Sequence, residues 1–170
     1  VYKRQVQRRR EVRDALAKWT PPPALGTPPS VITEPITIML WGITEETVEE
    51  WLGVNPSADG DILRGVPAAS GKATGLARIV KDSEDLYQIR DSEILICRIV
   101  APSWAPVFSR IAAAVSDVGG IMAHSAIISR EYGLPSVVGT GFATANIQTG
   151  DLVEVDGDAG TVRVLERAPG

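Results

Sequence analysis

The sequence predicts an α/β domain, in which strands alternate with helices before a terminal hairpin. Three observations support this prediction. Apolar runs of strand length alternate with helical patterns from about residue 62 onward. A glycine pair, Gly119 and Gly120, separates one of these runs from the helical pattern that follows. The chain then finishes with two alternating segments joined by an Asp-Gly turn, which is typical of a hairpin. Together they predict a compact domain of about one hundred residues.

The composition is that of an ordinary globular protein. Of the 170 residues, 44% are apolar and 22% are charged, and the net charge is −4. No apolar run approaches the roughly 18 to 20 residues that span a bilayer, and nothing at the N-terminus resembles a signal peptide. We therefore expect a cytoplasmic protein without a membrane partner. Because the chain begins at Val1 rather than at a methionine, we also expect it to be part of a longer polypeptide.

The first 61 residues are predicted to be an accessory segment and linker. Residues 6–19 have helical spacing and lie within a basic cluster, whereas the rest of the chain is acidic. Since aromatic residues are almost absent from this cluster, we expect no nucleic-acid binding. The prolines of "TPPPALGTPPS" predict an extended linker within residues 21–35. "TEETVEEWL" follows as a short helix with Thr44 as its N-cap.

The second predicted domain covers residues 62–167, and its elements follow in a simple order. "ILRGVPAASGKATGLARIV" predicts two short strands, and "DSEDLYQI" predicts a helix. "EILICRIV" is a buried strand containing Cys97, the single cysteine, which we expect to be inert. After the loop or short helix "PSWAPVFSR" comes the buried strand "IAAAVSDV". A helix from about Ala123 to Tyr132, the strand "PSVVG" and the hairpin "DLVEVDGDAGTVRVL" complete the domain.

His124, the only histidine, lies in the first turn of a predicted helix directly after the glycine pair. Free amides and the positive dipole end of such a helix form an anion site and favour the neutral, nucleophilic imidazole. The ring is therefore suited to accept a phosphoryl group, with Ser125 as a possible hydroxyl donor. Capping or packing also explains the spacing, and the spacing by itself favours that explanation over phosphoryl transfer. A metal site is not expected, because no second histidine exists to complete a ligand set.

The run "GGIMAHSAIISREYGLPSVVGTG" resembles the phosphohistidine signature of the PEP-utilising enzymes. This family includes pyruvate phosphate dikinase, phosphoenolpyruvate synthase, rifampicin phosphotransferase, phenylphosphate synthase and, more distantly, enzyme I of the sugar phosphotransferase system. Similarity continues through "RGVPAASGKATGLARIV", "ILICRIVAPSWAPVF" and "GDLVEVDGDAGTVRVL". The positions that match the signature are Gly119, Gly120, His124, Ala126, Ile127, Arg130, Glu131, Tyr132, Gly133, Pro135, Val137, Val138 and Gly139.

The resemblance implies the swivelling β/β/α phosphohistidine domain, with His124 as the phosphorylated residue. It implies a relay in which ATP or phosphoenolpyruvate donates the phosphoryl group at one partner domain and an acceptor takes it at another. ATP and Mg²⁺ would be bound by the partner domains, and no cofactor by this chain alone. Gly119, Gly120 and Ser125 are expected to support the phosphate, with possible support from Asp117 and Arg130.

Two positions depart from the family pattern. Met122 and Ala123 stand where many members have a pair that ends in serine, so a hydroxyl next to His124 is missing. This departure leaves open a second hypothesis, a non-catalytic binding or regulatory module that retains the fold. The turn at residues 139–141 is compatible with anion binding but is expected to be mainly architectural. Ser103 is assigned no catalytic role, and the acceptor cannot be identified from the sequence.

Overall fold

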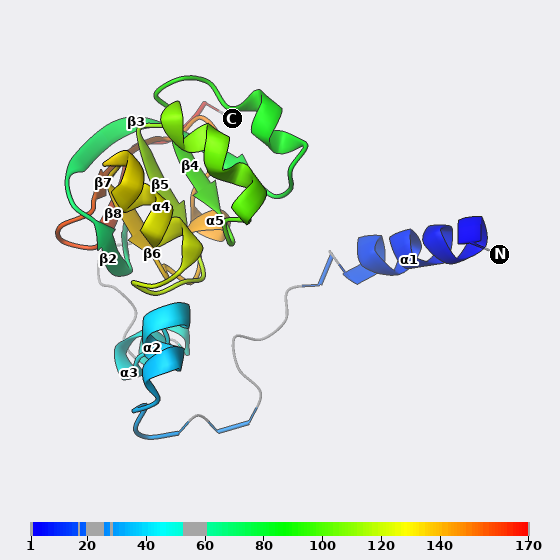
Figure 1. Ribbon diagram of the computed structural model, residues 1–170, viewed down its shortest axis with the longest axis horizontal. Helices are drawn as coiled ribbons and strands as arrows, with labels where there is room; N and C mark the ends of the chain where they lie inside the picture. The colour runs from blue at the N-terminus through cyan, green and yellow to red at the C-terminus, as the bar shows by residue number, and fades with distance from the viewer. Residues whose placement is uncertain (1, 17, 20–25, 28, 53–60, 170) are drawn as a thin grey trace.

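Eight strands form one mixed sheet in the computed structural model, which describes residues 2–16, 18–19, 26–27, 29–52 and 61–169 (Figure 1). Their order across the sheet is β1-β8-β7-β3-β4-β5-β6-β2. The bounds are β1 Ile62–Arg64, β2 Val66–Ala69, β3 Lys72–Val80, β4 Ile94–Cys97, β5 Ala113–Ser116, β6 Ser136–Val138, β7 Leu152–Asp156 and β8 Thr161–Glu166. The predicted α/β class is confirmed.

The central strands β3, β4, β5 and β6 run parallel, and antiparallel strands flank them on both sides. The predicted hairpin is β7 and β8, which pair antiparallel with Val155 opposite Val162. The two strands predicted before residue 80 are in fact three. The chain is divided at Gly65 because β1 pairs with β8 whereas β2 pairs with β6, at opposite edges of the sheet.

Strand β4 contributes to the apolar core on both faces of the sheet. Ile94 and Ile96 belong to one apolar cluster, and Leu95 and Cys97 belong to another. Since successive strand residues point to opposite faces, this explains why the run reads as continuously apolar. Cys97 has no exposed surface, and its burial raises the pKa of the thiol far above the ordinary range. The expectation that Cys97 is a buried strand residue is confirmed.

Helix α4 (His124–Tyr132) packs on β2, β5 and β6 and against the 3₁₀ helix η2 (Pro102–Ser109). The predicted helix near residue 85 is only a 3₁₀ turn, η1 (Asp85–Gln88). Side chains explain the difference, because Asp82 accepts from the Glu84 amide and competes with a longer helix. The sequence did not predict the four-residue helix α5 (Ala143–Asn146), which is too short to show a period.

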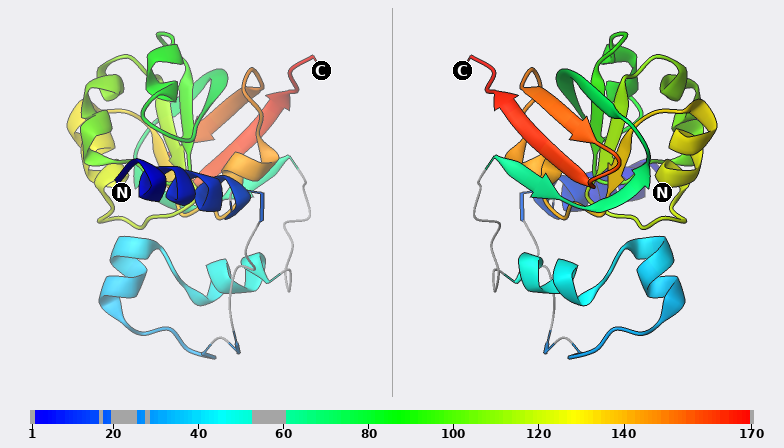
Figure 2. Two further views of the ribbon diagram at one scale, coloured as in Figure 1. Left: turned by 90° about the vertical axis from the view of Figure 1, so that its right-hand side faces the viewer. Right: turned by 90° about the vertical axis from the view of Figure 1, so that its left-hand side faces the viewer.

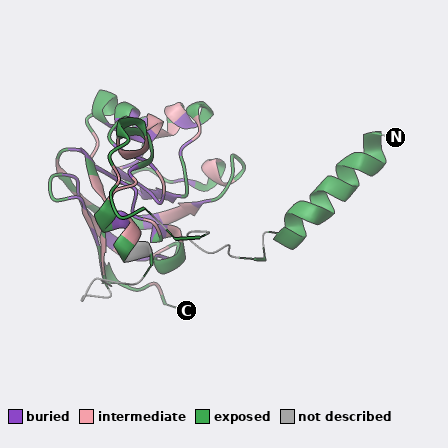
Figure 3. Cartoon of the chain, turned by 90° about the horizontal axis from the view of Figure 1, so that it is seen from below, coloured by how far each residue is buried: buried purple, intermediate pink, exposed green. Residues whose placement is uncertain are grey.

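Among the described residues, three helices precede the sheet. The predicted basic helix is α1 (Tyr2–Leu16), which starts and ends earlier than expected and is exposed along its length (Figure 3). Helices α2 (Pro35–Trp41) and α3 (Glu45–Trp51) lie below one end of the sheet in both views of Figure 2. The Thr44 hydroxyl accepts from the Thr47 amide at 3.2 Å, as expected for a cap.

The predicted proline-rich linker is described only in part. Residues 26–27 and 29–34 are in neither helix nor strand, and the rest of the linker before residue 29 lies outside the described residues. Among the described helices, none combines the length and the apolar character that a membrane span requires.

Candidate functional site

The site lies where the parallel strands end. Strand β5 ends at Ser116, and the Asp117 amide then donates to the Cys97 carbonyl of β4 at 3.0 Å. The loop after β6 is tied to the same point, since the Thr140 amide donates to the Ser116 carbonyl at 3.1 Å. The loops after three neighbouring strands therefore meet at one edge, which is where ligands bind in open α/β sheets.

The two adjacent glycines are required for different reasons. Gly119 has φ = 139°, in the region that favours glycine. Gly120 does not have a positive φ, but a Cβ there would lie 2.4 Å from the Met39 carbonyl oxygen of α2. The first glycine is needed for its backbone angle, and the second is needed because another segment approaches closely.

His124 is the first residue of α4, and Ala123 is the N-cap. Ala123 has extended backbone angles of −62° and 152°, as an N-cap should, but its methyl group offers no side-chain hydrogen bond. The first turn of α4 therefore has no side-chain cap. Ser125, in the same turn, is only 4% exposed.

The imidazole of His124 has an unusual environment. Its Nε2 atom is buried and has no hydrogen-bond partner among the described residues. The hydroxyls of Ser129 and Ser136 are also buried and unpaired among the described residues, so the lack of a partner does not by itself identify a ligand. What distinguishes His124 is its place at an uncapped helix N-terminus, where free amides and the helix dipole attract anions.

Asp117 holds the neighbouring loop in place. Its carboxylate accepts from the Thr144 amide at 3.0 Å and from the Thr144 hydroxyl through a short bond, with a longer contact of 3.5 Å to the Thr140 hydroxyl. Burial raises the pKa of Asp117, and these hydrogen bonds oppose the rise only in part. Hydrogen bonds therefore hold the Asp117 carboxylate in place, and their donors come mainly from α5.

Arg130 connects the glycine loop to the sheet. Its guanidinium donates through Nε to the Ala68 carbonyl of β2 at 2.7 Å and through Nη2 to the Ile121 carbonyl. The sequence suggested support of the phosphate by Arg130 and did not predict this arrangement. In the structure Arg130 positions the residues that lead into His124.

The hydrogen-bond donors in the turn at residues 139–141 already have partners within the fold. The Gly141 amide donates to the Asp117 carbonyl at 2.9 Å, and the Thr140 amide and hydroxyl both donate to the Ser116 carbonyl. These donors are therefore not available to an anion, which agrees with the expected architectural role.

The sequence did not predict two parts of the site. Thr144, the main partner of Asp117, lies on the short helix α5, which has no periodic signal. The C-terminal turn of α2 contacts the glycine loop, although about eighty residues separate them in the sequence. The glycine pair itself was the one available signal, since it indicates close approach by some other segment.

The missing cap gives a prediction for stability. Ala123→Ser places a hydroxyl at the N-cap, where it can accept from a first-turn amide, so we expect a gain of about 1 kcal/mol in the free energy of unfolding. Urea titration measures this gain. Ala145→Ser, at an exposed position inside α5, is the matched control and is expected to give no gain. Equal effects of the two substitutions would show that position 123 is not a functional cap.

Comparison with known proteins identifies the domain. The model of the PEP-utilising enzyme mobile domain matches residues 89–160, which include the glycine pair and His124. The uncharacterized phosphotransferase YvkC of Bacillus subtilis is 40% identical over 104 residues, which are 61% of this chain and 12% of the relative. The rifampicin phosphotransferase of Bacillus cereus is 37% identical over 139 residues, 82% of this chain and 15% of the relative.

A third relative belongs to the same group. The phosphoenolpyruvate synthase of Aeropyrum pernix is 41% identical over 106 residues, which are 61% of this chain and 13% of that protein. The chain thus spans less than a fifth of each of these three relatives. The family match covers the strands and loops that form the edge around His124, so residues 89–160 match the mobile domain of the PEP-utilising enzymes.

Proposed function

We propose that this chain is the phosphoryl carrier of a phosphotransferase, and that His124 is the residue phosphorylated. The observation that carries this proposal is the unpaired, buried Nε2 of His124 at the uncapped start of α4, within the region that the family model matches. The names of the relatives, a rifampicin phosphotransferase and a phosphoenolpyruvate synthase, support phosphoryl transfer as the chemistry.

The step is an in-line displacement at phosphorus. A lone pair on a nitrogen of the neutral imidazole forms the N–P bond while the P–O bond to the donor breaks, and the leaving oxygen keeps the electron pair. The proton on the other ring nitrogen stays in place. A second displacement, by a deprotonated oxygen of the acceptor, forms the new P–O bond and breaks the N–P bond, whose electron pair returns to the nitrogen and restores the neutral imidazole. Such transfer depends mainly on positioning and charge stabilisation.

The surroundings of His124 are suited to hold the transferred charge. The first-turn amides of α4 lack a side-chain cap and can donate to phosphoryl oxygens, and the positive end of the helix dipole favours an anion. Gly119 and Gly120 provide the turn that places the ring there, with Ser125 beside it. Asp117 and Arg130 act as positioning residues, because their hydrogen bonds are to α5, to β2 and to the glycine loop and not to the ring.

The rest of the relay is proposed to lie outside this chain. Because the chain matches only 12% to 15% of three relatives, separate domains or subunits would bind the donor and the acceptor. We propose that residues 62–167 move between them on the segment 1–61, and that ATP, with Mg²⁺, or phosphoenolpyruvate is the donor at a cytoplasmic partner domain.

Intact-mass analysis tests the proposal. The chain is incubated with Mg·ATP or with phosphoenolpyruvate, together with the donor-binding domains of a related phosphotransferase that lacks its own mobile domain. We expect one phosphoryl group on the chain, lost in acid and retained in alkali as for a phosphoramidate. Peptide mapping is expected to place it on His124. Absence of label with both donors, or acid-stable label on Ser125, would contradict the proposal. Either result would favour the hypothesis of a non-catalytic module.

A further inference from the structure

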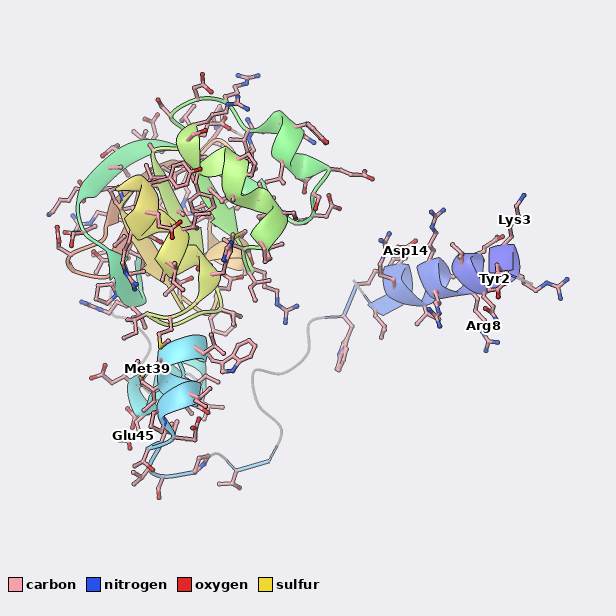
Figure 4. All side chains as sticks on the ribbon, viewed as in Figure 1. Tyr2, Lys3, Arg8, Asp14, Met39 and Glu45 are labelled. Atoms are coloured by element: carbon pink, nitrogen blue, oxygen red, sulfur yellow. The ribbon has the colours of Figure 1, made fainter. Side chains whose placement is uncertain are left out.

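Helix α2 contacts the glycine loop through backbone hydrogen bonds. The carbonyls of its last three residues, Met39, Leu40 and Trp41, accept from three loop amides. The donors and distances, in that order, are Met122 at 2.8 Å, Gly120 at 2.9 Å and Gly119 at 3.3 Å. Figure 4 shows Met39 at the end of α2 that faces the sheet domain.

The backbones of α2 and the glycine loop approach each other closely, and glycine residues make this approach possible. A Cβ on Gly42, which follows α2, would lie 2.2 Å from the Gly119 carbonyl oxygen, so only glycine lets the two backbones approach this closely. Gly42 ends α2 with φ = 69° and ψ = 22°, and its carbonyl accepts from the buried Thr47 hydroxyl of α3 at 3.1 Å. At the other end, the Glu34 carboxylate caps α2 by accepting from the Thr37 amide at 2.6 Å.

This contact has few of the features of a permanent interface. None of the residues of α2 is buried, and Met39, Leu40 and Trp41 are each more than a third exposed. The apolar surface removed from water is small, so backbone hydrogen bonds are the main attachment. Because such bonds contribute little net free energy when water can replace them, the contact can open.

The contact is also unfavourable for phosphate. The carbonyl end of a helix carries partial negative charge, and here it occupies loop amides next to a site proposed to bind an anion. An incoming phosphoryl group would be repelled by these carbonyls and would find the amides of Gly119 and Gly120 already bonded. Nε2 of His124 is buried in the same structure.

We propose that α2 is an intramolecular cap on the glycine loop, which shields His124 until the cap is released. The proposal rests on the proposed function of His124 and adds its regulation. By linkage, anything that stabilises the phosphorylated loop releases α2, and anything that holds α2 in place slows phosphorylation. A partner domain that binds the exposed apolar residues of α2 would favour the open state.

Chemical modification of the single histidine tests the cap without any phosphodonor. Diethyl pyrocarbonate adds one carbethoxy group to an accessible imidazole, and the rate at His124 is followed by peptide mapping, because amines and phenols of the chain also react. Gly42→Ala and Gly120→Ala disrupt the contact from opposite sides, because the new methyl group meets the Gly119 oxygen or the Met39 oxygen. We expect both to react about tenfold faster than the wild-type chain, since a cap closed about 90% of the time slows access by that factor.

Gly26→Ala is the matched control. Gly26 also has a positive φ, 82°, but nothing lies within 4 Å of its Cβ position, so the substitution adds backbone strain without touching the cap. It is expected to react at the wild-type rate. Wild-type rates in both Gly42→Ala and Gly120→Ala would overturn the proposal, and so would an equal acceleration by Gly26→Ala.

Amide hydrogen exchange provides a second readout in case a substitution affects folding. In Gly42→Ala the amides of Gly119, Gly120 and Met122 are expected to exchange faster, whereas those of Thr140 and Gly141, bonded within the same edge, keep their protection. Uniform loss of protection would mean general unfolding and would contradict a local cap. A chain that shows cap release but no phosphohistidine would refute the proposed function and not the cap.

Discussion

Replacing His124 by alanine is expected to reduce phosphoryl transfer by about 10⁴-fold or more when the chain is assayed with its donor and acceptor domains. The reason is that the covalent intermediate has no other proposed site, and direct transfer between separate partner domains lacks the in-line geometry. His124→Gln keeps a polar side chain but no nucleophilic nitrogen, and is expected to show the same loss. The measurement is the rate of product formation from ATP or phosphoenolpyruvate.

The fold is expected to survive both substitutions. Nε2 of His124 has no partner among the described residues, so alanine removes no hydrogen bond from the ring nitrogen. The control is Tyr132→Phe, at the last and half-exposed position of the same helix, which is expected to retain full transfer. Transfer by His124→Ala above about 1% of the wild-type rate, with normal thermal unfolding, would show that the phosphoryl group travels by another route.

Asp117→Ala is expected to be the most destabilising single change at the site, by about 3 kcal/mol. The substitution leaves the Thr144 amide and hydroxyl without their acceptor in a largely buried place, and each unpaired donor costs about 1–3 kcal/mol. Asp117→Asn keeps an oxygen for the amide, so we expect a loss within about 1 kcal/mol. Urea denaturation of the two variants measures the difference, and equal losses would contradict this hydrogen-bonding role.

The pH dependence of Asp117 has a definite sign. Burial raises the pKa of this carboxyl above its ordinary value of 3.8 in the folded chain, so the folded state binds the proton more tightly than the unfolded state. The resulting stabilisation is complete below pH 3.8 and is lost as the pH rises through the raised pKa. We therefore expect wild-type stability, relative to Asp117→Asn, to fall from acidic to neutral pH. A constant difference would show that the carboxyl titrates normally.

Local patterns were sufficient for much of the fold. The run "EILICRIV" predicted a strand buried on both faces, because its apolar residues leave no polar face, and β4 confirms this. The Asp-Gly turn predicted the β7–β8 hairpin. The sequence failed for β1 and β2, because their separation follows from pairing with distant strands at opposite edges of the sheet. It also failed for η1, where the cause is local, because the Asp82 side chain competes for backbone amides.

At the site, local patterns were enough to predict where His124 lies. A strand, a glycine pair and a helix start are local features, and together with the family signature they place one imidazole at a helix N-terminus. How its neighbours act depends on the three-dimensional arrangement. Arg130 braces the loop through the Ala68 and Ile121 carbonyls, Asp117 binds Thr144, and Gly120 makes room for α2. These roles depend on contacts between distant segments, which periodicity and turn chemistry do not encode.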